Sequence, residues 1–412
     1  MLDRAETVPG RTGAPSHAIL PRLLLAALIR RMKSLRLLLG LLSLAASTFA
    51  ASEAAEYWTF FGTYTGAKSK GIYAAKFDTR TGKFGAPQLA AETTNPTFLV
   101  VHPNGRWLYA IGETGNYGGK KSGSIAAYTI DAASGKLTAL NSQPSGGAGP
   151  CHVFVDQTGK CVLAANYGGG SVTSVPIKDD GSLAEPGSFI QHVGSSVNKG
   201  RQEGPHGHCM ITDPSNRFAL ACDLGLDKVL IYKLDPTTAT LTPNDPAFGS
   251  TAPGAGPRHI AFHPNGKFAY VISELDCTMT TFAWDGKRGS LTAVDSVSTI
   301  PGERQKSFST AEVQVHPNGK FVYGSNRGHN SIAVFTVDQT TGKLTRIQNE
   351  STQGKTPRHF TLDPTSRFLI AENQDSSDAF VYSVDQNTGR LTPTGEKIEV
   401  GSPVCAVFVP VK

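Results

Sequence analysis

The sequence predicts an all-β fold, a seven-bladed β-propeller of four-stranded antiparallel blades, from two observations. The first is composition: 44 Gly and 25 Pro, about one residue in six of 412, suit many short strands joined by tight turns and exclude an all-helical fold. The second is a repeated segment that starts at Pro96, Pro150, Pro205, Pro257, Thr310, Pro357 and Pro403. These starts lie 54, 55, 52, 53, 47 and 46 residues apart, a period typical of units that bury their apolar faces only against neighbouring copies.

Each repeat contains four predicted strands. An apolar strand ends in a turn such as His-Pro-Asn-Gly, and a second strand follows at once, as at residues 268–273. A third alternating strand, as at 228–234, leads through an Asp-x-x-Thr-Gly-Lys/Arg-Leu-Thr turn to the fourth, as at 338–345 and 385–392. Four antiparallel strands in about 50 residues form one propeller blade. We interpret His102, His263 and His316 of the His-Pro-Asn-Gly segments as turn residues.

Both ends of the chain are predicted to complete the ring. Six full repeats run from Pro96 to about Gly401, and a single inner strand follows at 403–409. Three strands without a partner precede them, at 58–63, 71–77 and 87–92. Together these four strands make a seventh blade, which removes the exposed edges of an open row of strands. We therefore expect one propeller domain, residues 56–412.

Residues 1–55 are predicted to be a leader with a secretory signal peptide. Basic residues 30–36 precede a Leu-rich run at 37–46 and small residues at 47–52, with cleavage expected near Ala50 and Met32 as an alternative start. The apolar core of about ten residues is shorter than the roughly 20 needed to span a membrane. We expect export to the periplasm or the medium with no stable membrane span after cleavage, or a cytoplasmic protein where the leader does not function.

Charge and cysteine content exclude several classes of partner. The net charge is +6, but residues 1–55 carry seven Lys/Arg against three Asp/Glu, so the rest carries only +2, which argues against nucleic acid. The six Cys include no Cys-x-x-Cys pair, which argues against zinc ribbons. Cys209 and Cys222 are expected opposite each other on neighbouring strands, and two free thiols are favoured over a disulfide. We expect a monomer with no cofactor and no metal.

Hairpin register predicts which side chains share one rim of the ring. The first strand starts where the second strand ends, so pairing outward from the turn at Asn265 places Arg258 opposite Ser273 and beside Glu274. The same count places His208 opposite Asp223 and Arg358 opposite Asn373. The predicted rim set is His152, Asn166, His206, His208, Asp223, Arg258, His259, Glu274, Glu312, Arg327, Arg358 and His359.

This rim set suits an anionic small molecule and proton transfer near neutral pH. The alternative is structural: each His could tie one blade to the next, and Arg258 and Arg358 could simply pair with carboxylates. The departures from the repeat favour a functional site. One repeat alone carries Glu203-Gly-Pro-His-Gly-His208, and not every blade has a carboxylate at the position of Glu274. No Gly-x-Ser-x-Gly, Walker or His-Glu-x-x-His motif is present.

The sequence resembles the family of seven-bladed bacterial 6-phosphogluconolactonases, which also contains the fungal carboxymuconate and muconate lactonizing enzymes. The resemblance runs from Phe61-Gly-Thr-Tyr64 to Val404, and its carriers are the segments 203–208, 256–259, 272–274, 311–313, 325–329 and 356–359. It implies a catalytic His, Glu and two Arg, which match His208, Glu274 and Arg258. Arg327 is the expected second Arg, because the inner strand has Ser309-Thr-Ala-Glu312 in that place.

The resemblance therefore implies a metal-free hydrolase of a sugar lactone, with 6-phosphogluconolactone as the substrate. We expect His208 to deprotonate water, Arg258 and Arg327 to bind the oxyanion or the phosphate, and Glu274 to orient Arg258 or His208. Six further rim residues are predicted to contact substrate: His152, His206, His259, Glu312, Arg358 and His359. Two alternatives stay open: hydrolysis or cycloisomerisation of an unphosphorylated aldonolactone or another lactone, and a non-catalytic exported propeller that binds carbohydrate or protein.

Overall fold

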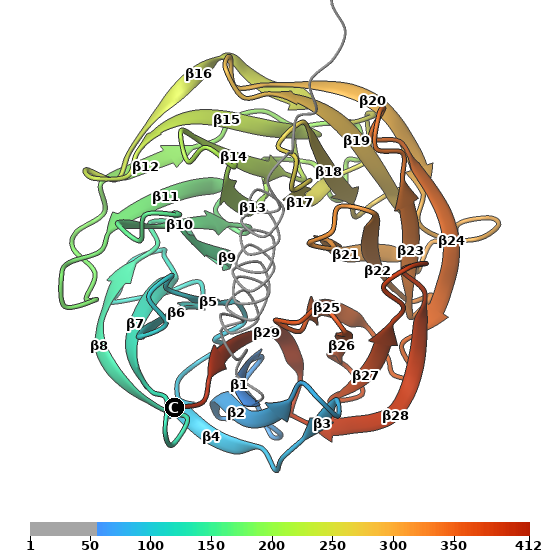
Figure 1. The fold of residues 1–412 in the computed structure, drawn as a ribbon. Helices are drawn as coiled ribbons and strands as arrows, with labels where there is room; N and C mark the ends of the chain where they lie inside the picture. The colour runs from blue at the N-terminus through green and yellow to red at the C-terminus, as the bar shows by residue number, and fades with distance from the viewer. Residues whose placement is uncertain (1–55) are drawn as a thin grey trace, which may run out of the picture. The chain divides into compact units, whose positions relative to one another are not determined.

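All seven predicted blades are present in the computed structural model, which describes residues 56–412 (Figure 1). The predicted leader lies outside the described residues. Six sheets have four antiparallel strands, and the seventh has five because two short strands share its outer edge. We number the blades from the one that holds the first and the last described strands, so blade 1 contains β29, β1, β2, β3 and β4, blade 2 contains β5–β8, and blade 7 contains β25–β28.

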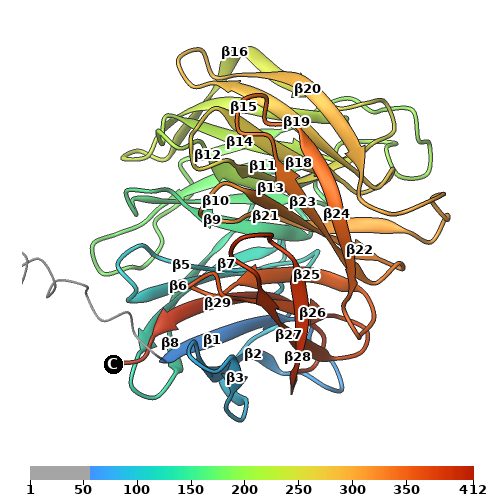
Figure 2. The ribbon, with the colours of Figure 1, turned by 45° about the vertical axis from the view of Figure 1, so that its right-hand side comes forward.

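The strands fall into four concentric positions (Figures 1 and 2). The inner strands are β29 (Pro403–Pro410), β5 (Leu99–Val101), β9 (Pro150–Val155), β13 (Gly207–Thr212), β17 (Pro257–Phe262), β21 (Ser309–Val315) and β25 (Pro357–Leu362). The second strands are β1 (Glu56–Thr63), β6 (Trp107–Gly112), β10 (Cys161–Asn166), β14 (Phe218–Asp223), β18 (Phe268–Ser273), β22 (Phe321–Arg327) and β26 (Phe368–Asn373).

The outer half of each blade is equally regular. The third strands are β2 (Gly71–Asp78), β7 (Ser124–Asp131), β11 (Ser171–Pro176), β15 (Lys228–Asp235), β19 (Thr278–Asp285), β23 (Ser331–Val337) and β27 (Asp378–Val384). The outermost strands are β3 (Lys83–Phe84) and β4 (Gln88–Glu92), β8 (Lys136–Pro144), β12 (Ser188–Gln191), β16 (Thr240–Ser250), β20 (Ser290–Ser298), β24 (Leu344–Ser351) and β28 (Leu391–Glu399). Residues 56–412 include no helix long and apolar enough to cross a membrane.

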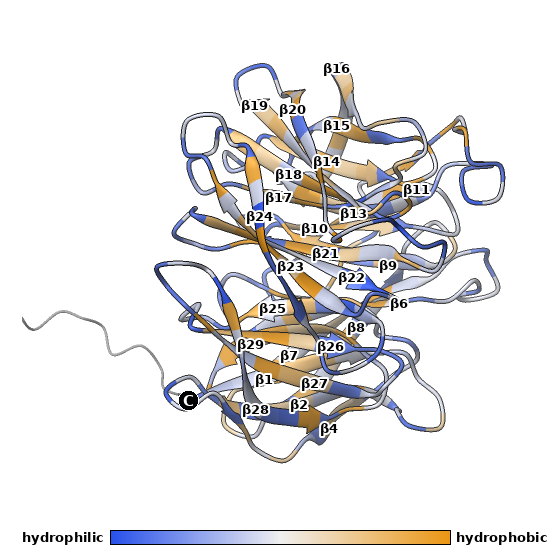
Figure 3. Ribbon diagram, turned by 90° about the vertical axis from the view of Figure 1, so that its right-hand side faces the viewer, coloured by the Kyte–Doolittle hydropathy of each residue, from blue (hydrophilic) through white to orange (hydrophobic). Residues whose placement is uncertain are grey.

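Blade 1 closes the ring as the sequence predicts. β29 pairs antiparallel with β1, from Tyr57 opposite Pro410 to Thr63 opposite Pro403. The last strand of the chain is thus the inner strand of the blade whose other strands come first. Hydrophobic residues are concentrated in the strands and hydrophilic residues in the connecting loops (Figure 3). Buried hydrophobic clusters between neighbouring blades cover both faces of each sheet.

A repeated contact between glycine and an aromatic ring joins neighbouring blades. In six blades the Gly of the turn after the third strand has a positive φ and lies directly on an aromatic ring from the second strand of the preceding blade. The pairs are Gly82–Phe368, Gly135–Trp58, Gly181–Trp107, Gly289–Phe218, Gly342–Phe268 and Gly389–Phe321. In blade 4 the position of this Gly is taken by Ala239. The second strand of the preceding blade has Cys161 there, which is smaller than an aromatic ring, and both residues belong to one hydrophobic core cluster.

This contact predicts a stability defect for Gly342→Ala. A Cβ at Gly342 would lie 2.5 Å from Phe268 Cδ1, and the φ of +73° is unfavourable for a residue with a side chain. We expect about 2–4 kcal/mol of destabilisation from overpacking and backbone strain together, measured by urea unfolding. Gly266→Ala is the matched control, because Gly266 has a φ of +67° but no atom within 4 Å of the added methyl group. Equal losses for the two variants would show that the ring contact contributes nothing.

The predicted hairpin register holds along the inner strands and then shifts near the start of six of the seven inner strands in residues 56–412, with β5 as the exception. Cys209 lies opposite Cys222, as predicted, and His259 lies opposite Ile272. The predictions for His208, Arg258 and Arg358 are wrong by one position, because Asp223, Ser273 and Asn373 pair with Gly207, Pro257 and Pro357 instead. His208, Arg258 and Arg358 have no partner on the second strand because each lies in a β-bulge, and counting residues from the turn does not reveal a bulge. Single bulges occur at Cys151, His208, Arg258, Arg358 and Val404, and a double one at Ala311 and Glu312.

The His-Pro-Asn-Gly histidines are turn residues, as predicted. His102 Nδ1 accepts a hydrogen bond from the backbone NH of Asn104, and its Nε2 donates to the carbonyl oxygen of Gly159 in the next blade at 2.9 Å. His263 makes the same pair of contacts with Asn265 and Gly319. They tie adjacent blades together at the end of the inner strands away from the predicted rim.

Candidate active site

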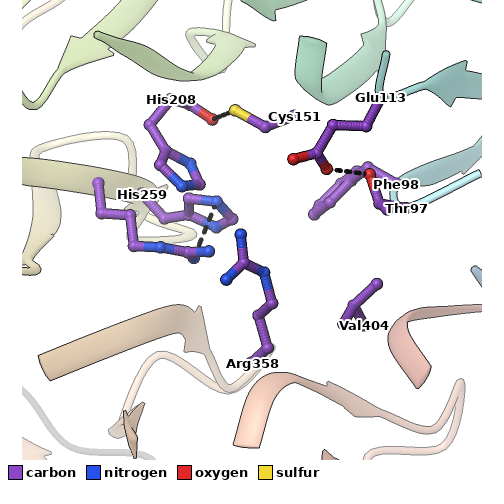
Figure 4. Close-up of a pocket in the computed structure, with 9 residues that line it drawn as sticks. Thr97, Phe98, Glu113, Cys151, His208, His259, Arg358 and Val404 are labelled. Carbon is purple, nitrogen blue, oxygen red and sulfur yellow. Dashed lines mark hydrogen bonds between the residues drawn. The ribbon is translucent and has the colours of Figure 1, made fainter. Parts of the chain in front are cut away.

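The single-residue bulges converge on one pocket. Cys151, His208, Arg258, Arg358 and Val404 all line it, although they come from five different blades. Because a bulge adds a residue and redirects the side chains beside it, the inner strands can present these groups together at one place. Thr97, Phe98, Glu113 and His259 complete the wall (Figure 4). We call this space the inner pocket. Its free volume of about 10 Å³ is close to the space one water molecule needs.

A larger space, the outer cavity, adjoins the inner pocket. It has a volume of about 360 Å³ and shares Glu113, Cys151, His208 and Arg358 with the inner pocket. The remaining lining residues are Tyr167, Arg201, Glu274, Ser309 and Arg327. All seven blades therefore contribute to the combined site, which is wide enough at the outside for a sugar-sized molecule.

Glu274 joins three arginines at the wall of the outer cavity. Its carboxylate contacts Arg258 Nε at 3.2 Å, Arg327 Nη2 at 2.8 Å and Arg201 Nη2 at 2.7 Å. Burial alone would raise the pKa of Glu274, but the three guanidinium groups hold it well below its usual range. The predicted pairing of Glu274 with Arg258 is therefore present, and Glu274 is an anion that fixes arginines in place.

The guanidinium of Arg258 is almost fully engaged in the protein. Besides Glu274, its Nη1 donates to the carbonyl oxygen of Ala311 at 2.7 Å and to His259 Nε2 at 3.2 Å. Burial lowers the pKa of Arg258 to about 10, helped by Arg327 and Arg358, so the group stays charged at neutral pH. Of its nitrogens, Nη2 alone makes no hydrogen bond within residues 56–412.

Arg358 offers its whole guanidinium to the inner pocket. None of its nitrogens forms a hydrogen bond or ion pair with another described residue, and the group lies 5.6 Å from the centre of the Tyr64 ring. Burial would lower the pKa of Arg358, but the nearby Tyr64 and Glu113 raise it. Glu113 is held by Tyr64, whose hydroxyl donates to both carboxylate oxygens at 2.8 and 2.9 Å. A buried cation with unused donors is a ready site for an anionic oxygen.

His208 faces both spaces and is electrically neutral. Its Nδ1 is buried and has no hydrogen-bond partner among residues 56–412, and its ring lies 5.2 Å from that of His259 and 5.5 Å from that of Tyr167. Burial lowers the pKa of His208 well below 6.5, and Arg258, His259 and Arg358 add to the shift. A neutral imidazole beside a water-sized pocket can accept a proton.

Behind His259 lies a buried network of acids and histidines. His259 accepts from Arg258 at Nε2, so its Nδ1 carries the proton that it donates to Glu312 at 2.8 Å. Glu312 also lies 3.6 Å from His359, which bonds Glu372 at 2.8 Å. Burial raises the pKa of Glu312, and Glu372 and Glu312 raise the pKa of His359 against burial. The network sets the tautomer of His259 and thereby the position of Arg258.

The structure brings together some predicted site residues and separates others. All four predicted catalytic residues, His208, Arg258, Glu274 and Arg327, line the inner pocket or the outer cavity, and so do Arg358 and His259. His152, His206, Glu312 and His359, which were predicted to contact substrate, do not line either space. Glu312 and His359 belong to the network behind His259, and His152 packs on Phe98, at 4.4 Å between ring centres, and lies 3.5 Å from Cys209 Sγ.

His206, Asn166 and Asp223 hold the surrounding loops. His206 stacks on Tyr167 at 4.6 Å and bonds the Tyr167 carbonyl oxygen, so it supports a residue of the outer cavity. Asp223 bonds His192 at 2.6 Å, and Asn166 bonds the carbonyl oxygen of Ser145. All six Cys are free and buried, which agrees with the favoured state of Cys209 and Cys222. Residues 56–412 contain no cluster of three or more His, Cys, Asp or Glu side chains placed to hold a metal ion.

Sequence reasoning missed Tyr64, Glu113, Tyr167 and Arg201. Tyr64 lies within the Phe61-Gly-Thr-Tyr64 segment that carries the family resemblance, so that segment could have indicated it. Glu113 and Tyr167 directly follow second strands, as Glu274 does, and the same position in each repeat could have indicated them. Arg201 lies in an irregular connection between β12 and β13, for which the repeat provides no register.

Three comparisons with known proteins agree on the family. A family model described as "Lactonase, 7-bladed beta-propeller" matches residues 59–408. A 6-phosphogluconolactonase of Bacillus subtilis is 41% identical over 308 residues, which cover 75% of this chain and 85% of the relative. The periplasmic gluconolactonase of Pseudomonas aeruginosa superposes with a TM-score of 0.82 at 33% identity, over 87% of this chain and all of that one. A crystal structure of a 6-phosphogluconolactonase homologue from Bacteroides fragilis superposes with a TM-score of 0.81 at 34% identity, over 87% of this chain and 99% of that one.

Proposed function

The chain belongs to the family of seven-bladed β-propeller lactonases, and we propose that it hydrolyses the ester bond of a sugar lactone, with 6-phosphogluconolactone as its substrate. The observation that carries the proposal is the inner pocket, where a neutral His208 and the unpaired guanidinium of Arg358 face a space for one water molecule. Membership of an enzyme family, together with this site, favours catalysis over the alternative of a propeller that only binds.

The site supports hydrolysis by one attacking water. A lactone bound in the outer cavity with its carbonyl towards the inner pocket places the carbonyl oxygen near Arg358 and Arg258. Their guanidinium groups stabilise the negative charge that develops on this oxygen when water attacks. His208 accepts the proton of that water and then returns it to the ring oxygen as the ester bond breaks. Glu274 holds Arg258 and Arg327 in place and stays ionised throughout.

The charge of the site favours a phosphorylated substrate. Four arginines (Arg201, Arg258, Arg327 and Arg358) and two carboxylates (Glu113 and Glu274) line the two spaces, a net of two positive charges when the histidines are neutral. A phosphate monoester carries between about −1.5 and −2 at pH 7. We assign Arg201 and Arg327 to the phosphate because they lie in the outer cavity and away from the inner pocket.

An unphosphorylated gluconolactone is the second candidate. The Pseudomonas aeruginosa relative is named a periplasmic gluconolactonase, and the leader of this chain is predicted to direct export, away from the chiefly cytoplasmic sugar phosphates. We propose that the protein is exported, on the basis of the signal-peptide pattern in its leader. The smaller substrate would leave Arg201 and Arg327 bound only to Glu274 and to neighbouring protein groups.

A lactone panel tests the proposal. Acid release is measured with 6-phosphogluconolactone, gluconolactone and galactonolactone after subtraction of spontaneous hydrolysis, with each product identified. We expect the highest kcat/KM for the phosphorylated lactone and a selective loss of that preference in Arg201→Ala. An enzyme that opens none of these lactones contradicts the proposal. A rate for gluconolactone equal to or above that for the phosphorylated lactone selects the second candidate.

The pH profile should reflect the lowered pKa of His208. The base form of His208 is the neutral imidazole, which is populated above the pKa of the folded protein, and burial and the arginines place that pKa well below 6.5. We therefore expect kcat/KM to stay constant as the pH falls through 6.5 and to decrease only at clearly lower pH. Circular dichroism at each pH checks that the protein remains folded. An acid limb centred at pH 6.5 or above would argue against His208 as the base.

A further inference from the structure

A side chain at the end of the second strand fills the gap to the preceding blade in most of the ring. In blades 3, 6 and 7 this residue is Asn166, Asn326 or Asn373, and its Nδ2 donates to the carbonyl oxygen of the preceding connection at 3.0–3.1 Å. The same Nδ2 also bonds the first residue of the third strand at 3.0–3.2 Å. In blade 4 Asp223 makes the equivalent bridge to His192.

Blade 2 has Gly112 in this position. Gly112 pairs with Ser124, the first residue of β7, as Asn166 pairs with Ser171 and Asn326 with Ser331. Because Gly112 has no side chain, no amide fills this position as it does in blades 3, 6 and 7, and the Ser124 hydroxyl lies where a Cβ would be. The result is a groove of about 430 Å³ between blades 1 and 2, which are neighbours in the ring (Figure 1). Its walls come from the connection after β4, from β6, from the connection between β6 and β7, and from β7 and β8.

The lining of the groove is polar and uncharged. It consists of Thr93, Thr94, Ala110, Ile111, Gly112, Thr114, Asn116, Tyr117, Ser124, Ala126 and Ser142. The hydroxyl groups of Thr94, Ser124 and Ser142 make no hydrogen bond to any residue in 56–412, so their donors and acceptors are available. The aliphatic side chains of Ala110, Ile111 and Ala126 add an apolar surface.

This combination matches the chemistry of a neutral sugar ring. A pyranose presents hydroxyl groups that exchange hydrogen bonds with Ser and Thr, and CH groups that pack on apolar or aromatic surfaces such as Tyr117. A charged ligand would find no opposite charge among the groove's side chains, and a wholly apolar one would leave the hydroxyls unpaired. The groove also differs from the outer cavity, which is dominated by arginine and carboxylate.

The groove is close to the active site but separate from it. Gly112 and Thr114 line the groove, while Glu113 between them lines the inner pocket and the outer cavity. Successive residues thus face different spaces, as expected for extended backbone. We propose that the groove between blades 1 and 2 is a second binding site that takes one neutral hexopyranose ring, free or as the end of a longer saccharide.

Binding of methyl β-D-glucopyranoside tests the proposal, because this sugar is uncharged and has no lactone to open. Isothermal titration and saturation-transfer NMR should show saturable binding with a Kd in the millimolar range, about −4 kcal/mol. Gly112→Asn should weaken this binding at least tenfold, since Asn can bond Ser124 and the Thr93–Thr94 backbone as Asn166 bonds Ser171 and Ser145. Gly85→Asn is the matched control, at an exposed position with only ordinary contacts, and should bind as the wild type does.

Two further measurements separate the groove from the active site. Tyr117→Ala, which removes a ring at the margin of the groove and leaves the blade contacts intact, should also weaken sugar binding. Saturating 6-phosphogluconate should leave the methyl glucoside bound, and Gly112→Asn should keep its kcat/KM for lactones within about twofold. Absence of saturable binding, equal binding by Gly112→Asn, or displacement by 6-phosphogluconate would each overturn the proposal, and none of these results depends on the chain being a lactonase.

Discussion

Alanine at His208 is expected to lower kcat/KM for lactone opening at neutral pH by about 10²–10⁴-fold, the usual contribution of a general base. The loss should appear in kcat, because removal of the imidazole leaves the arginines that bind the substrate in place. His208 makes no side-chain hydrogen bond within the described part of the chain, so its removal breaks none. The truncation should therefore leave the fold intact, with an unchanged circular dichroism spectrum.

His206→Ala is the matched control for this variant. His206 lies two residues earlier on the same segment and stacks on Tyr167, but it lines neither the inner pocket nor the outer cavity. We expect a loss of less than tenfold from this change. If His208→Ala turned over substrate as the wild type does, His208 would have no part in the mechanism. If the two variants lost activity equally, the loss would come from disturbance of the shared segment.

Replacement of Glu274 by Gln is expected to have the second large effect. The amide keeps the size of the carboxylate but removes the charge that faces Arg201, Arg258 and Arg327. Three guanidinium groups would then repel one another without a counter-ion, and Arg258 and Arg327 would leave the positions that the reaction needs. We expect kcat/KM to fall by about 10²–10³-fold and unfolding free energy by about 3 kcal/mol, as for a buried ion pair that loses one partner.

Urea unfolding and steady-state kinetics of the same preparation measure both effects. Glu203→Gln is the control, because the side chain of Glu203 is 61% exposed and its one ion pair within residues 56–412 joins it to His206, at 3.4 Å. We expect it to be close to wild type in both assays. A Glu274→Gln enzyme with wild-type stability and activity would show that the arginines keep their arrangement without the carboxylate.

The repeat in the sequence was sufficient to predict the fold, because the structure of each blade depends mainly on local sequence patterns. Strand alternation, the turn residues and the constant spacing recur in every blade, so an error in one repeat is corrected by the others. The closure by both chain ends followed from counting strands, and β29 pairs with β1 as expected.

The site was only partly predictable, because the bulges and the irregular loops depend on tertiary contacts. A count from the turn cannot detect the extra residue that turns Arg258 and Arg358 into the pocket, although it correctly placed Arg258 near Glu274. The sequence alone also does not show how far along the central channel each side chain lies. His152 and His359 were therefore predicted to contact substrate, while the structure places them outside the lining of the inner pocket and the outer cavity.

Blade 1 combines strands from both ends of the described chain, and this has a consequence for biosynthesis. Val404, on the final strand, forms part of the pocket wall, and β29 supplies the only inner strand of that blade within residues 56–412. A nascent polypeptide whose residues 403–410 are still inside the ribosome cannot assemble the catalytic centre, however much of the preceding chain has already folded. Activity should therefore begin only after β29 has emerged and paired with β1, and a truncation that removes residues 403–412 should yield an inactive protein.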